Sequence, residues 1–157
     1  MAIKVSSTTV IDDTRNIVNV IAFTASGNVA AGNINLADGV LSRPKVQDYA
    51  LTVNALGNVE SSATINLESG NYITATATGP VTWTFSNPPG NGIAGGFILV
   101  LTNGGNFTQT WPGGTAWPGG TAPTLTNNGT DVLVFITNNA GTTWRGVGSM
   151  LDSKVPA

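Results

Sequence analysis

The stretch from residue 69 to residue 130 contains no Asp, Glu, Lys or Arg. It holds three of the four tryptophans, the apolar run 97–101, and a tandem hexapeptide, Trp-Pro-Gly-Gly-Thr-Ala, that starts at Trp111 and again at Trp117. A long segment of apolar residues, Thr, Asn, Gly and Pro, without helix-forming composition, is typical of packed β-structure. The stretch therefore predicts an all-β fold and leaves few residue types for catalysis.

Charge is scarce along the whole chain. Only 9% of the 157 residues are charged, against about 25% in an ordinary soluble domain. Because solubility depends largely on charged surface, we predict that identical or neighbouring subunits cover much of this protein. The alternative is a monomer kept soluble by Asn, Thr and Gly.

The residue types that are missing exclude several functions. The chain has no Cys and no His, which removes the usual metal ligands, thiol nucleophiles and the commonest general base. Its six Lys and Arg are scattered and its net charge is −2, so nucleic-acid binding is not expected. No apolar run is long enough to span a bilayer, and the start does not resemble a secretory signal. We expect no enzyme activity, no catalytic residue, no cofactor, no metal, and no nucleic-acid or membrane partner.

The N-terminal residues 1–40 are predicted to form a β-arm or anchor. Within them, β-branched residues alternate with small polar ones between turn residues, and Gly-Asn-Val at residues 27–29 returns at residues 57–59. Because a two-stranded ribbon is marginal in water, such an arm needs a partner surface. The candidate contacts with other subunits or a capsid are its apolar residues Val10, Ile11, Ile17, Val20 and Phe23.

Residues 41–60 are predicted to be a linker. Val46, Tyr49, Ala50 and Val53 have helical spacing, so a short helix fits part of it, while alternation through residues 49–55 fits a strand nearly as well. We place a β-domain over residues 61–150 and a tail over residues 151–157.

The β-domain is predicted to be an antiparallel β-sandwich or jelly roll. About seven short strands follow one another with turn residues between them, at Gly79-Pro80, at residues 103–106 and at residues 138–141. Residues 95–102 and 131–138 are apolar on both faces, which is expected for central strands.

Two N-terminal phrases resemble bacteriophage proteins. Residues 8–17, Thr-Thr-Val-Ile-Asp-Asp-Thr-Arg-Asn-Ile, look like the short β-repeats of phage tail fibres and other virion surface proteins. The segment from Gly39 through Pro44 and Tyr49 to Gly57 is similar to one that precedes the terminal β-module in virion proteins of marine and cyanobacterial phages.

The C-terminal resemblance rests on four ordered phrases. Residues 81–89, 97–102, 117–125 and 131–136, the last followed by Gly-Thr-Thr-Trp-Arg-Gly at 141–146, look like a β-module common at the C-terminus of phage virion structural proteins. This chain differs in having Trp-Pro-Gly-Gly twice. The resemblance implies a homotrimer in the virion that contacts other virion proteins, as a capsid-surface decoration protein. The alternative is a short tail fibre or tip that binds host surface carbohydrate.

Trp111 and Trp117 are the candidate surface-binding aromatics. Indole faces on rigid loops can stack on a sugar. Because Trp is usually largely buried, each indole could equally cover an end of the sandwich or a seam between subunits. Among the carboxylates, Asp12 and Asp13 fit turn residues better than a calcium site, which needs about six to eight oxygens. Glu60 and Glu68 are too far apart along the chain to act as a glycosidase pair.

Overall fold

The computed structural model describes residues 3–5, 8–11, 47 and 49–154. The chain divides into two units, Met1–Val46 and Gln47–Ala157. In the N-terminal unit, β1 (Ile3–Val5) pairs antiparallel with β2 (Thr8–Ile11). Of the candidate arm contacts, Val10 and Ile11 belong to β2, while Ile17, Val20 and Phe23 lie outside the described residues.

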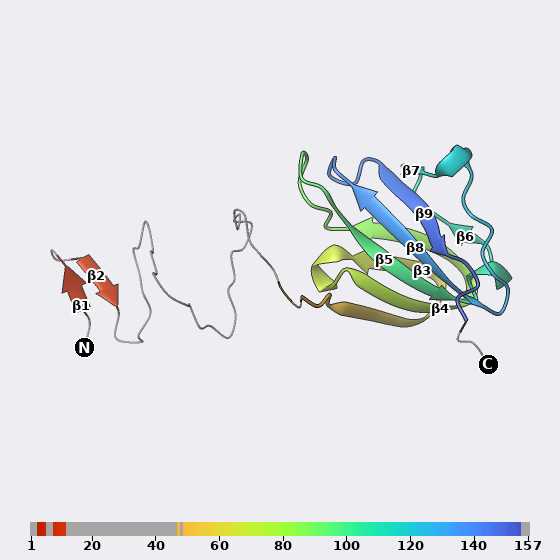
Figure 1. Ribbon diagram of the computed structural model, residues 1–157, viewed down its shortest axis with the longest axis horizontal. Helices are drawn as coiled ribbons and strands as arrows, with labels where there is room; N and C mark the ends of the chain where they lie inside the picture. Colours follow the sequence, from red (N-terminus) through yellow and green to blue (C-terminus); the bar gives the residue numbers. More distant parts are fainter. Residues whose placement is uncertain (1–2, 6–7, 12–46, 48, 155–157) are drawn as a thin grey trace. The chain divides into compact units, whose positions relative to one another are not determined.

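The C-terminal unit is built almost entirely of strands (Figure 1). Its sheet has the order β3-β4-β5-β8-β9-β7, and β6 pairs with β4. Three short 3-10 turns lie between the strands. The elements are β3 (Val53–Asn66), η1 (Leu67–Ser69), β4 (Tyr72–Ser86), β5 (Gly95–Thr102), η2 (Gly104–Asn106), β6 (Gln109–Thr110), β7 (Thr115–Ala116), η3 (Pro118–Gly120), β8 (Thr130–Thr137) and β9 (Trp144–Met150).

The strand directions correct the prediction of an antiparallel sheet. Within the C-terminal unit, β5 with β8 and β8 with β9 are antiparallel, whereas β3 with β4, β4 with β5, β4 with β6, and β7 with β9 are parallel. The all-β prediction is confirmed. The jelly-roll connection is not established by this strand order.

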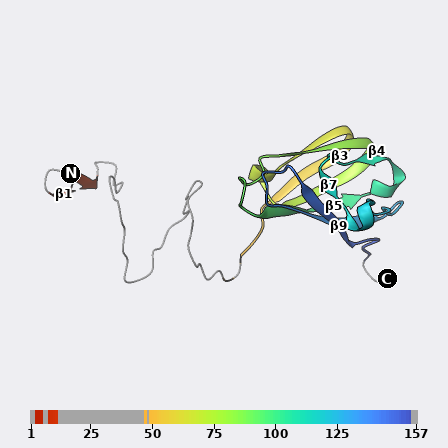
Figure 2. The same cartoon turned by 90° about the horizontal axis from the view of Figure 1, so that it is seen from above.

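β3 and β4 are successive coils of the chain. Val53 pairs with Tyr72 and Asn66 with Ser86, and along β3 each partner lies eighteen to twenty residues further on. A straight strand of fourteen residues would be roughly 46 Å long, and the five residues that follow β3 could span at most about 18 Å. Straight parallel strands are therefore impossible here. β3 must curve back on itself so that β4 can start beside its first residue, and the curved strands are visible in Figure 2.

Two glycines allow this path. The pairing of β3 with β4 shifts register between Ala55 and Gly57 and again between Val59 and Ser61. Gly57 and Ser61 have φ of 68° and 62° there, and such bulges bend a strand. At the end of the coil, Gly70 has φ of 143°, and a Cβ on it would lie 2.4 Å from the carbonyl oxygen of Thr52. The coil closes where only glycine fits.

The two halves of each curved strand form two layers around one core. The first half of β4 pairs with β5, and its second half pairs with β6. Alternate residues of both halves are buried in the same cluster, including Ile73, Ala75, Val81 and Trp83. Leu99, Leu133 and Phe135 of the antiparallel strands complete this core with Trp144. The β-sandwich-like character is thus confirmed.

Some local predictions need correction. β3 begins at Val53, so the second part of the predicted linker 41–60 belongs to the C-terminal unit. Gln47 and residues 49–52 contain no helix. β4 continues without a break through the predicted turn at Gly79-Pro80. The segment after η2 pairs in parallel with β4 instead of forming a hairpin with β5.

A buried carboxylate fixes the end of the C-terminal unit. Asp131, at the start of β8, is fully buried. Its oxygens accept hydrogen bonds from the backbone N–H of Thr126 (2.7 Å), the hydroxyl of Thr126 (2.8 Å) and the backbone N–H of Asp152 (2.9 Å). One side chain therefore ties the loop before β8 to the segment after β9.

Candidate assembly surface

The outer face of the layer that contains β5, β8 and β9 is apolar. Residues that alternate with the core residues of this layer point outward, and paired strands place them in rows across the sheet. One row runs across five strands as Val53, Tyr72, Ile98, Val134 and Val147. A second runs as Ala55, Thr74, Val100, Val132 and Met150. We call these two rows, with Ile136 and Arg145 beside them, the apolar face.

Large aliphatic side chains of the apolar face are open to solvent. Ile136 is 52% exposed, Val147 43% and Met150 54%. Their strands have a full core on the opposite side, so burial of these residues is not needed to hold the unit together. An aliphatic surface of this extent, across several strands, is typical of a contact with another molecule.

The second layer provides an internal comparison. Its outward positions in β3, β4 and β6 are occupied by small polar side chains. These are Ser62, Thr64, Thr82, Thr84 and Thr110. The same alternation thus gives a Ser/Thr surface on one layer and a Val/Ile surface on the other. The fold tolerates polar residues at outward positions, so folding alone does not explain the Val/Ile surface. This difference favours a role of the apolar face in contact with another molecule.

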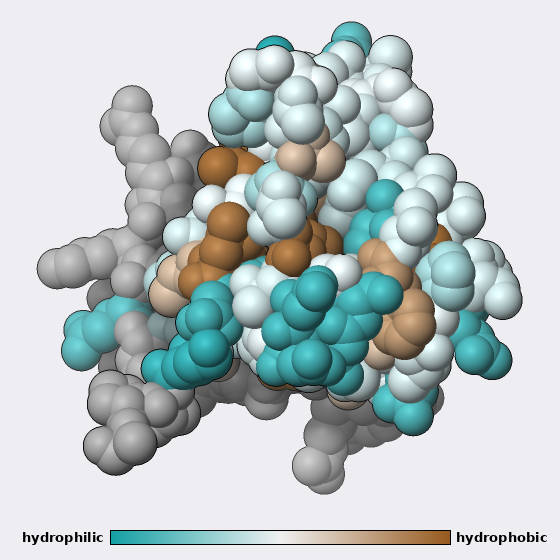
Figure 3. Space-filling model, turned by 90° about the vertical axis from the view of Figure 1, so that its right-hand side faces the viewer, coloured by the Kyte–Doolittle hydropathy of each residue, from teal (hydrophilic) through white to brown (hydrophobic). Residues whose placement is uncertain are grey.

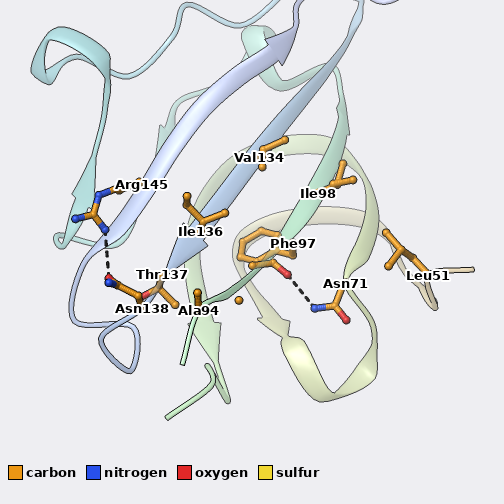
Figure 4. Close-up of a pocket in the computed structure, with 12 residues that line it drawn as sticks. Leu51, Asn71, Ala94, Phe97, Ile98, Val134, Ile136, Thr137, Asn138 and Arg145 are labelled. Atoms are coloured by element: carbon orange, nitrogen blue, oxygen red, sulfur yellow. Dashed lines mark hydrogen bonds between the residues drawn. The ribbon is translucent and has the colours of Figure 1, made fainter. Parts of the chain in front are cut away.

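The apolar face is hollowed on both sides of Arg145. A depression of about 750 Å³ lies between Leu51, Asn71, the start of β5 and Ile136, as Figure 4 shows. A second one, of about 380 Å³, lies between Trp117, Pro118, Ile136 and Val147. Arg145 lines both. These hollows could receive protruding side chains of a partner.

Polar groups at the larger hollow are few and are engaged with one another. The guanidinium of Arg145 donates to the side-chain oxygen of Asn138 (3.4 Å), and the amide of Asn71 donates to the carbonyl of Gly96 (2.9 Å) (Figure 4). No Asp or Glu lines either hollow. The lining can bind an apolar surface, but it offers no acid and base pair for hydrolysis.

Figure 3 shows one side of the C-terminal unit, where hydrophobic groups are exposed between hydrophilic ones and most atoms have intermediate hydropathy. In the part of the chain that the structure describes, no three His, Cys, Asp or Glu side chains gather into a metal site. Within the same residues, no helix has the length and hydropathy needed to cross a membrane.

Trp111 and Trp117 lie in an aromatic cluster. Trp111 stacks on Trp83 with ring centroids 5.7 Å apart and an angle of 12°. Trp117 contacts Trp111 and Phe135 edge to face, at 5.6 and 5.5 Å. Both are partly buried against the core. The structure therefore places the candidate surface-binding aromatics mainly as a cover for the core, with Trp117 also bordering the smaller hollow.

The position of Trp117 depends on the absence of a side chain at Gly146. A Cβ on Gly146 would lie 2.6 and 2.8 Å from two ring carbons of Trp117. We expect Gly146→Ala to displace the indole and to lower stability by about 1 to 3 kcal/mol, as overpacking usually does. Tryptophan fluorescence and thermal unfolding measure this. Gly113→Ala is the matched control, since no atom lies within 4 Å of its Cβ position; equal effects of the two substitutions would contradict the prediction.

Sequence reasoning missed the apolar face. It identified residues 95–102 and 131–138 as apolar on both sides, and read this as complete burial in the sheet centre. The structure buries one side of each strand and leaves the other partly exposed. The available signal was the contrast between these strands and the Ser/Thr-rich alternation of residues 82–86.

Comparison with known proteins finds no matching family model, no matching curated protein and no matching solved structure.

Proposed function

We propose that this protein is a non-enzymatic structural component of a bacteriophage virion. In this proposal it is a homotrimer that decorates the capsid surface and stabilises the particle through contacts between proteins. The apolar face is the observation that carries the proposal, because it requires a covering partner and offers no reactive group.

Composition supports an assembled state. Arg145, Lys154, Glu60, Glu68, Asp131 and Asp152 are the charged residues from position 49 to position 154. Asp131 is buried, and Asp152 pairs with Lys154 at 2.6 Å. So little exposed charge opposes self-association only weakly, and closed symmetry is the usual way to cover such a surface. The location in a virion, and the number three, rest on the resemblance of residues 81–146 to phage virion modules.

A short tail fibre or tip that binds host carbohydrate is the second candidate. The observation that favours it is the smaller hollow, where the indole of Trp117 and the guanidinium of Arg145 border the same space. An aromatic ring and a cation are suited to a sugar that carries a carboxylate. Positive binding on a glycan array, lost in Arg145→Ala, would move this candidate to first place.

The mass of the purified protein in solution tests the proposal. We expect light scattering coupled to size-exclusion chromatography to give three times the chain mass of 16.0 kDa. Copy number in purified particles then separates the candidates, since a coat-wide complement indicates decoration and a few copies at one vertex indicate a tail appendage. A monomer that persists at high concentration would contradict the proposal.

A further inference from the structure

The larger hollow of the apolar face has a shape suited to a long, narrow ligand. It begins at Arg145 in β9, which pairs with Ile136 in β8, and Ile136 pairs with Gly96 in β5. Asn71 and Leu51, just before β4 and β3, extend the lining, and Figure 4 shows Arg145 and Leu51 at opposite ends. The hollow thus crosses the sheet from β9 towards β3. Neighbouring strands are about 4.8 Å apart, so this path spans roughly 19 Å.

The middle of the hollow is aliphatic and is shaped by the strands themselves. Ile136 is 52% exposed and Leu51 44%, and the outward side chains of Ile98 and Val134 lie between the two ends. Gly96 occupies the outward position opposite Ile136, where a Cβ would clash with the backbone of β8. The volume of about 750 Å³ is within the usual range of small-molecule sites, roughly 300 to 1,000 Å³.

One end of the hollow carries a positive charge. Arg145 is the only Lys or Arg in the lining, and among the described residues no Asp or Glu lines the hollow. Within the same residues, Arg145 forms no salt bridge. It uses a single N–H, which donates to Asn138 at 3.4 Å, so most of the guanidinium donors are free to bind a ligand. The planar fork of these donors matches a carboxylate.

The rest of the lining favours an alkyl chain over a sugar or a peptide. Among the described residues no Trp or Tyr lines this hollow, and Phe97 is only 3% exposed, so a sugar has no aromatic face on which to stack. The backbones of β5, β8 and β9 pair with one another. A bound peptide would therefore lose water from its own backbone groups without gaining partners. An alkyl chain has no such groups, and burial of each methylene is favourable.

We propose that the larger hollow binds a fatty acid, whose alkyl chain lies along Ile136 towards Leu51 and whose carboxylate pairs with Arg145. A bound chain also fills a space that would stay empty if a flat partner covered the apolar face, and empty space forfeits packing contacts. The lining belongs entirely to the C-terminal unit. The proposal therefore does not depend on the trimer or on the virion role.

Calorimetry on the full-length protein with decanoate, below its micelle concentration, tests the proposal. Decylammonium is the matched ligand, with a similar chain and the opposite charge. We expect decanoate to bind at least about tenfold more tightly, because a charge-assisted pair with Arg145 replaces a contact between like charges. Arg145→Gln should remove this preference. Lys154→Gln removes the other cation of residues 49–154 and should leave the preference unchanged.

Two substitutions to tryptophan locate the ligand. Ala94→Trp fills the larger hollow from the loop before β5, and Pro118→Trp fills the smaller one from η3. Both positions are exposed, so we expect both variants to fold, which circular dichroism checks. Ala94→Trp should weaken decanoate binding at least about tenfold, whereas Pro118→Trp should leave it unchanged. The proposal would be overturned by loss of binding in Pro118→Trp alone, by equal affinities of the unmodified protein for the two ligands, or by no binding of decanoate.

Discussion

Asp131→Ala should destabilise the C-terminal unit by about 3 to 5 kcal/mol. The substitution removes the fully buried acceptor of three hydrogen bonds and leaves two part-buried backbone N–H groups, those of Thr126 and Asp152, without their partner. Each unsatisfied buried donor costs about 1 to 3 kcal/mol. Thermal unfolding and urea titration measure the loss, and we expect hydrogen exchange to rise first in the loop before β8 and in the segment after β9.

The matched control is Asp152→Asn, which removes a carboxylate charge from the other end of the same network. The Asp152 side chain is 44% exposed and pairs with Lys154, and such pairs contribute at most about 1 kcal/mol. Asn also tolerates the positive φ of 57° found there. If Asp131→Ala were as mild as this control, the buried carboxylate would not be a structural tie.

Val134→Glu should convert the proposed trimer into monomers. Val134 lies at the centre of the apolar face, between Ile98 and Val147, so any partner covering the face would bury the new carboxylate without a counter-charge. An unpaired buried charge costs about 3 to 5 kcal/mol, which weakens association by roughly 100- to 4,000-fold. Analytical ultracentrifugation over a concentration series measures the shift.

Thr84→Glu is the corresponding control on the polar layer. Thr84 is exposed on an outward position of β4, so its replacement adds the same charge to a surface that the proposal leaves uncovered. Circular dichroism should match the unmodified protein for both variants, because neither position is in the core. Thermal unfolding should match it for Thr84→Glu, whereas Val134→Glu loses the stability that assembly contributes. Dissociation by Thr84→Glu but not by Val134→Glu would place the contact between subunits on the polar layer and would contradict the prediction.

The sequence predicted the strands well and their pairing poorly. Alternation in Val81, Trp83 and Phe85 marked a half-buried strand, and these side chains do face the core. The turn at residues 138–141 does join two antiparallel strands, β8 and β9. These features depend on neighbouring residues, so a local pattern suffices to detect them.

Parallel coils could not be recognised in the same way. A strand that curves needs only occasional bulges, such as those near Gly57 and Ser61, and these residues also fit ordinary turns. Gly79-Pro80 has strong turn composition, yet its neighbours pair on both sides and keep it inside β4. The apolar face could not be recognised either. Whether a residue belongs to it depends on which of the two layers the residue occupies, and this is determined by the curvature of the strand.

The coiled path also determines how such a protein can change in length. Among the described strands, the backbone of each turn pairs only with the turn before it and the turn after it, as in stacked repeat proteins. Insertion or loss of one whole turn, about twenty residues for β3 and β4, would leave the remaining turns and the antiparallel cap of β8 and β9 intact. Duplication of short gene segments is thus a simple evolutionary route to taller or shorter versions of this molecule.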